Sequence, residues 1–139
     1  LYTLPPVRAA YRPFGGEAVA FACIWGCVTG AYVLQRGTLS GAAALVGIAY
    51  ASSCVAMLMM HHYLDRGPDS RAFPPKTTTI VLLGRPGRRY AVAWAAIALA
   101  GAALLAARAD AAFAVLAALL AVALLLHATV DPDDPAGVT

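Results

Sequence analysis

A chain of 139 residues of which 61% are hydrophobic and 12% are charged is too apolar for an ordinary soluble domain, because about a quarter of the residues in such a domain carry charge. Its net charge is +3, and most of its basic residues lie outside the apolar segments. The proline, glycine and aspartate content of the connections between these segments, and their position beside the membrane, argue against a nucleic-acid partner. The composition therefore predicts an integral membrane protein.

Four apolar stretches approach or exceed the roughly 17–25 residues that a membrane-spanning helix needs. These stretches cover residues 18–35, 39–64, 90–107 and 111–130. We therefore expect an all-α, multi-span transmembrane bundle with four transmembrane helices over residues 17–130. A lead-in over residues 1–16 precedes this bundle, and an acidic, disordered tail over residues 131–139 follows it.

The basic residues indicate how the bundle is oriented. All of the ten lysines and arginines except Arg36 and Arg108 lie before the first expected span or in the central loop, residues 65–89. The positive-inside rule places such segments in the cytoplasm. We expect a bacterial-type inner-membrane protein whose two termini and central loop are all cytoplasmic.

The first expected span carries two features of interest. Gly26 and Gly30 have the spacing that lets two membrane helices pack closely. Glu17 lies near the start of the span, where a carboxylate suits the positive end of the helix dipole. An alternative interpretation makes Glu17 a polar anchor that faces a cavity.

Two carboxylates, Asp65 and Asp69, stand where the second span ends. Side chains four residues apart point the same way if the helix continues, and paired carboxylates suit Mg²⁺, which shares its coordination with substrate phosphates. Lys76, Arg66 and Arg71 add positive charge that suits a phosphate group. This pattern indicates a site for a lipid diphosphate at the mouth of the bundle.

A simpler interpretation of the same residues stays open. Asp65 and Asp69 could be a helix-end cap and a loop carboxylate that Arg66 and Arg71 neutralise, and Lys76 could be an ordinary membrane anchor. The prolines of the central loop exclude one continuous helix, although residues 77–83 are apolar and β-branched enough for a short segment at the membrane interface.

Three stretches of the chain share the pattern of one family of membrane enzymes. Residues 10–17 are similar to a Lys-Tyr-Arg-Gly-Leu-Gly-Glu sequence, and residues 30–40 to Gly-Thr-Tyr-Tyr-Val-Gln-Thr-Gly. Residues 61–69 are similar to Asn-Asn-x-x-Asp-x-x-x-Asp, and residues 76–85 to the Lys-x-Thr and Leu-Gly-Arg that follow it. On these motifs the chain resembles the C-terminal half of UbiA-superfamily intramembrane prenyltransferases, most closely the 1,4-dihydroxy-2-naphthoate prenyltransferases of menaquinone synthesis.

The resemblance implies part of a nine-helix fold and a definite activity. Such enzymes transfer an isoprenoid chain from a prenyl diphosphate to an aromatic acceptor. By resemblance, Asp65 and Asp69 would bind Mg²⁺ and serve as catalytic residues, and Lys76 would contact the diphosphate. Arg66 and Arg71 would be further diphosphate contacts.

The chain also departs from the family pattern. His61 and His62 stand in place of the asparagine pair, and Pro75 in place of the glycine before the lysine. The first aspartate motif, the helices before it and a last helix are not in this sequence. We therefore expect a missing N-terminal half in the same or another chain, and no activity from this segment alone.

The alternative function is a non-catalytic four-helix membrane subunit. Such a subunit would bind a partner protein, lipid, haem or a quinone. Its candidate ligands are His61, His62 and His127, although adjacent histidines face different sides of a helix.

Overall fold

Four apolar helices make up most of the computed structural model, which describes residues 2–129. These helices are α1 (Gly15–Arg36), α2 (Gly41–Leu64), α5 (Gly87–Arg108) and α6 (Phe113–Thr129). The first three are long and apolar enough to cross a membrane, and α6 is a shorter apolar helix. The expected multi-span helical bundle is confirmed. The acidic segment 131–139 lies outside the described residues.

Short connections at the end distant from the central loop make consecutive helices antiparallel. Gly37 ends α1 with a φ of 71°, a left-handed conformation that glycine adopts without a steric penalty. At the next connection of this end, the Asp110 carboxylate accepts a hydrogen bond of 2.8 Å from the amide of Ala112 and so satisfies a free donor before α6. Both connections follow from local sequence.

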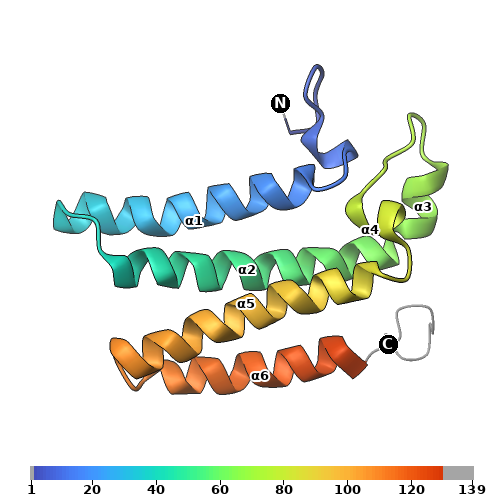
Figure 1. Cartoon of the computed structure of the whole chain (residues 1–139). Coiled ribbons are helices and arrows are strands. Elements are labelled where there is room, and N and C mark those ends of the chain that lie inside the picture. The colour runs from blue at the N-terminus through green and yellow to red at the C-terminus, as the bar shows by residue number, and fades with distance from the viewer. Residues whose placement is uncertain (1, 130–139) are drawn as a thin grey trace.

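The long helices are arranged in a row, in the order α1, α2, α5 and α6 (Figure 1). Glycines let neighbouring helices approach closely. A Cβ added at Gly47 of α2 would lie 3.0 Å from Trp25 Cδ1 of α1, and one added at Gly101 of α5 would lie 3.0 Å from Ala49 Cβ of α2. The central position of α2 therefore depends on small residues at two interfaces.

The glycine pair singled out from the sequence is not one of these contacts. A Cβ at Gly26 or at Gly30 would have nothing within 4 Å. The prediction that this pair packs closely is therefore wrong for contacts within the described chain. Gly26 and Gly30 have the right spacing, but Trp25 and Thr29 are the residues of α1 that meet Gly47 of α2.

Two short helices, α3 (Arg66–Arg71) and α4 (Thr79–Leu83), occupy the central loop. The prediction that the loop is not one continuous helix is confirmed. The side chain of Thr78 accepts a hydrogen bond of 3.4 Å from the amide of Val81 and caps α4. Ile80 is fully buried and packs with Met59, Tyr63 and Ala91. This short segment is therefore inserted among the long helices.

Candidate functional site

The two aspartates of the central loop lie one helical turn apart. Asp65 is the junction between α2 and α3, and its carbonyl oxygen accepts a hydrogen bond of 2.7 Å from the amide of Asp69. The chain therefore keeps a helical turn between them, which is the condition under which carboxylates four apart lie on one side. Asp65 is exposed and Asp69 is half-buried.

Lys76 is held against Asp69 by both backbone and side chain. Its ammonium nitrogen lies 3.3 Å from Asp69 Oδ1 in a hydrogen bond and 3.1 Å from Oδ2. Its amide donates a further bond of 3.1 Å to the carbonyl oxygen of Asp69. Oδ2 is buried, and its contact with Lys76 is an ion pair without hydrogen-bond geometry.

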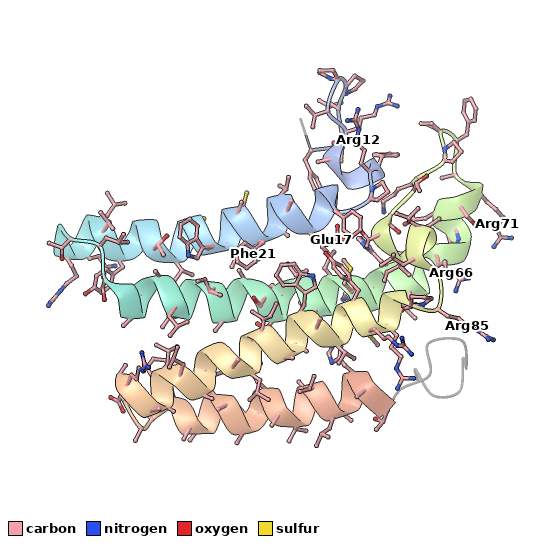
Figure 2. The ribbon with its side chains drawn as sticks, in the orientation of Figure 1. Arg12, Glu17, Phe21, Arg66, Arg71 and Arg85 are labelled. Carbon is pink, nitrogen blue, oxygen red and sulfur yellow. The ribbon has the colours of Figure 1, made fainter. Side chains whose placement is uncertain are left out.

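The arginines gather at the same end of the bundle. Figure 2 shows Arg66, Arg71 and Arg85 around the central loop and Arg12 on the lead-in. Arg71 is exposed, and its Nε donates a hydrogen bond of 3.2 Å to the carbonyl oxygen of Gly67. Arg66 is half-buried. All five residues expected at a diphosphate site are thus in one region, with Asp69 and Lys76 in direct contact.

A long-range hydrogen bond joins the lead-in to the central loop. The amide of Phe14 donates to Thr79 Oγ1 at 2.7 Å across 65 positions of sequence. Thr79 is fully buried. At Gly15, a Cβ would collide with the carbonyl oxygen of Ala9, so the chain turns tightly into α1. This bond brings two of the three resembling stretches, 10–17 and 76–85, into contact.

Two buried ionisable residues were not included in the expected site. Glu17 is 2% exposed and His62 is 7% exposed. Neither Glu17 Oε1 nor His62 Nδ1 has a hydrogen-bond partner among the described residues. The sequence held a signal for Glu17, because it is the single glutamate and lies in an apolar span. The exposed side chain of His61 confirms that the adjacent histidines face different sides.

Aromatic side chains connect α1 and α5 near this pair. The Phe14 and Tyr90 rings lie 5.7 Å apart, and the Tyr90 and Trp94 rings 6.1 Å apart. Phe21 extends the series at 5.5 Å from Trp94. These distances are typical of favourable aromatic pairs. The rings form a series from α1 to α5 in which Phe14 and Phe21 flank Glu17 on α1.

The carboxylate pair fits one mode of magnesium binding. In the described part of the chain no group of three or more His, Cys, Asp or Glu residues could hold a metal ion. Mg²⁺ typically keeps several waters and binds through one or two carboxylates together with substrate phosphates. Asp65 and Asp69 suit that mode, because they supply two carboxylates beside a cluster of cations.

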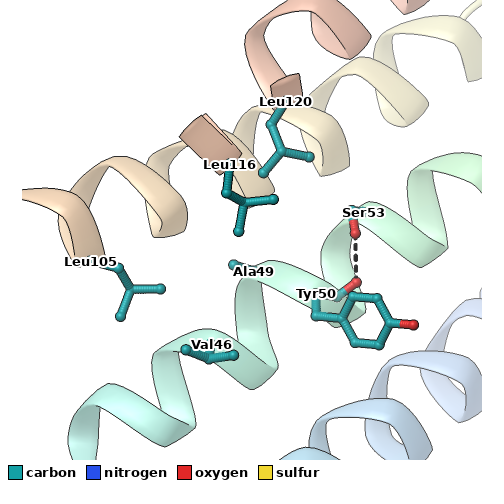
Figure 3. A pocket seen from close by; sticks show the side chains of 7 residues that line it. All are labelled: Val46, Ala49, Tyr50, Ser53, Leu105, Leu116 and Leu120. Atoms are coloured by element: carbon teal, nitrogen blue, oxygen red, sulfur yellow. Dashed lines mark hydrogen bonds between the residues drawn. The ribbon is translucent and has the colours of Figure 1, made fainter. Parts of the chain in front are cut away.

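Cavities lie farther along the bundle. One of about 160 Å³ opens between α2, α5 and α6 (Figure 3). Its lining residues are Val46, Ala49, Tyr50, Ser53, Leu105, Leu116 and Leu120. A wider, more open one of about 390 Å³ shares Val46 and Leu105 with it. Both have mainly apolar linings, which suit a hydrocarbon chain better than a charged group.

Comparison with protein-family models, with curated proteins and with solved structures gave no match. The function is therefore inferred from the residues of the chain itself.

Proposed function

We propose that this chain is part of a Mg²⁺-dependent intramembrane prenyltransferase, which transfers an isoprenoid chain from a prenyl diphosphate to an aromatic acceptor. The observation that carries the proposal is the helical turn in which the Asp69 amide donates a hydrogen bond of 2.7 Å to the carbonyl oxygen of Asp65. Lys76 is held against the carboxylate of Asp69. Such a site lies at the end of an apolar bundle, where an amphiphile with a charged head would bind. The chain's motifs resemble those of the UbiA superfamily.

The basic residues would bind the diphosphate. Lys76 is a compact charge beside Asp69, and α3 carries Arg66 directly after Asp65 and Arg71 two positions after Asp69. Fixed positive charge lowers the free energy of a leaving group on which negative charge accumulates. Bound at Asp65 and Asp69, Mg²⁺ would neutralise further phosphate charge.

The apolar helices would bind the isoprenoid chain of the substrate. The cavity between α2, α5 and α6 is lined mainly by hydrocarbon and suits the isoprenoid chain. By helix geometry, Ser53 lies about 18 Å along α2 from Asp65, so a chain of several isoprene units would reach the cavity from the carboxylates. A bundle of this kind also excludes water from a reactive carbocation.

The distribution of basic residues indicates which end of the bundle faces the cytoplasm. The central loop and lead-in hold eight basic residues, and the opposite end holds Arg36 and Arg108. We place the carboxylate end in the cytoplasm on that ground.

The test measures the binding of geranylgeranyl diphosphate, with and without Mg²⁺. The protein is purified together with any partner proteins that stay bound to it. Asp65→Asn and Asp69→Asn should each abolish magnesium-dependent binding. Asp110→Asn is the matched control, because Asp110 is a carboxylate at the opposite end, in the connection before α6. Wild-type binding in the Asp65 and Asp69 variants would overturn the site. No magnesium-dependent binding by the wild type would overturn the function and favour a non-catalytic membrane subunit.

A further inference from the structure

Glu17 and His62 are buried polar side chains with unused hydrogen-bonding capacity. Glu17 Oε1 and His62 Nδ1 have no partner among the described residues, although both side chains are more than nine-tenths buried. A buried polar atom without a partner destabilises the fold. Ionisable residues inside a membrane bundle mark functional sites more often than structural ones.

The two residues belong to one polar cluster. Glu17 lies in the first turn of α1 and His62 in the last turn of α2. A Cβ added at Gly16, the chain neighbour of Glu17, would lie 3.9 Å from His62 Cε1, and His62 lies one turn before Asp65, the C-cap of α2. The unused atoms therefore lie beside the candidate diphosphate site.

Half-buried aromatic rings of α1 and α5 lie near Glu17. Phe21 lies one turn along α1 from Glu17, and Figure 2 shows both on the side of α1 that faces α2. Trp94 contacts Phe21 and Tyr90, and Tyr90 contacts Phe14, the N-cap of the helix that carries Glu17. Rings at these positions can pack against a flat aromatic ligand by stacked or edge-to-face contacts.

We infer that Glu17 and His62 form a binding site for the hydroxyl group of an aromatic ligand whose ring packs among Phe21, Tyr90 and Trp94. A carboxylate oxygen accepts a hydrogen bond from the hydroxyl group, and the imidazole nitrogen donates or accepts one according to its tautomer. The inference rests on the proposed function in one respect, because it identifies this ligand as the acceptor of the prenyl group. Binding itself needs neither magnesium nor a prenyl diphosphate.

The experiment compares 1-naphthol with naphthalene, which lacks only the hydroxyl group. Binding to the purified protein in lipid nanodiscs is measured by calorimetry and by the fluorescence of its tryptophans, with empty nanodiscs to correct for partition into lipid. The wild type should bind 1-naphthol about tenfold more tightly or better, which is the worth of one hydrogen bond to a charged group. Glu17→Leu should bind the two compounds equally.

Glu17→Leu also separates binding from a structural role. Replacement of an unpaired buried polar group by an apolar one of similar size leaves stability unchanged or raises it, so loss of discrimination in a stable variant is a binding effect. Should Glu17→Leu fail to fold, Glu17→Gln keeps the shape with a weaker neutral acceptor and should lower the preference several-fold. Ser52→Ala is the control, because Ser52 Oγ on α2 is also buried and has no hydrogen-bond partner within residues 2–129.

Two results would overturn the inference. One is equal binding of 1-naphthol and naphthalene by the wild type, and the other is an unchanged preference in both Glu17 variants. Failure of the proposed function has a different signature. In that case geranylgeranyl diphosphate does not bind in a magnesium-dependent manner, while the preference for 1-naphthol still depends on Glu17.

Discussion

The amide of Phe14 donates a hydrogen bond of 2.7 Å to Oγ1 of Thr79, and so links the start of α1 to a buried helix in the central loop. Phe14 has a φ of 62°, a conformation that non-glycine residues adopt rarely. Thr79 has no exposed surface. The position of α4, and with it the path of the chain that carries Lys76, therefore depends on a contact with the lead-in.

Removal of this hydrogen bond should destabilise the fold. Thr79→Val keeps the shape of the side chain but leaves the Phe14 amide without its acceptor. The bond is part-buried, so its loss should cost about 0.5–1.5 kcal/mol. The melting temperature of the purified protein in detergent should fall. Thr77→Val is the control, because Thr77 is exposed two positions away. Equal melting temperatures for the two variants would show that the bond contributes nothing.

The helices could be predicted from the sequence because hydropathy is a local property. The apolar stretch 39–64 became α2 (Gly41–Leu64), and 90–107 lies within α5 (Gly87–Arg108). The partners of each helix could not be predicted in the same way. Small residues are frequent throughout the chain, so spacing alone did not distinguish Gly26 from Gly47, whose contact with Trp25 depends on how α1 lies against α2.

The candidate site was predictable to a similar degree. The spacing of Asp65 and Asp69 puts both on one side only if the helix continues, and the structure has that turn. The contact of Lys76 with Asp69 depends on the course of residues 72–75. Helical periodicity indicates that His61 and His62 face different directions, but it does not say which one is buried. Burial of His62 results from the packing of α1 and α4 against the end of α2.

Loss of the Lys76 charge should change the affinities of the proposed site for Mg²⁺ and for the diphosphate in opposite directions. Lys76→Met removes a positive charge 3.1 Å from Asp69 Oδ2. The carboxylate should then bind Mg²⁺ more tightly, because like charges repel, and geranylgeranyl diphosphate should bind about tenfold more weakly or worse for want of one charge-assisted contact.

Calorimetric titration with each ligand measures both effects of the Lys76 substitution. Lys76→Arg preserves the charge and should retain most of the diphosphate affinity. A loss of affinity for both ligands in Lys76→Met would instead indicate that Lys76 only holds the loop in place.

The interface between α2 and α5 should not tolerate a larger residue at Gly101. Even a Cβ there would lie 3.0 Å from Ala49 Cβ, so Gly101→Leu must separate two packed helices at a cost of about 1–3 kcal/mol or more. Gly26→Leu is the control, since a Cβ at Gly26 has no atom of the described part of the chain within 4 Å. Urea unfolding in mixed micelles should place Gly101→Leu well below the wild type and Gly26→Leu close to it. The reverse order would show that α1 uses Gly26 as a contact and that α5 lies elsewhere.

Two methionines on α2 offer a direct test of where the protein core lies. Met59 is fully buried against Tyr63, Ile80 and Ala91, whereas Met57 is 57% exposed. Met59→Ala should destabilise the protein by about 2–5 kcal/mol, because it removes buried surface and leaves a cavity beneath α4. Met57→Ala should have a much smaller effect, since lipid or detergent fills the space that its side chain leaves. Thermal unfolding of both variants in the same detergent measures the difference. Similar losses would mean that the exposed side of α2 is covered by protein, and that Met57 packs in an interface with another chain or another segment.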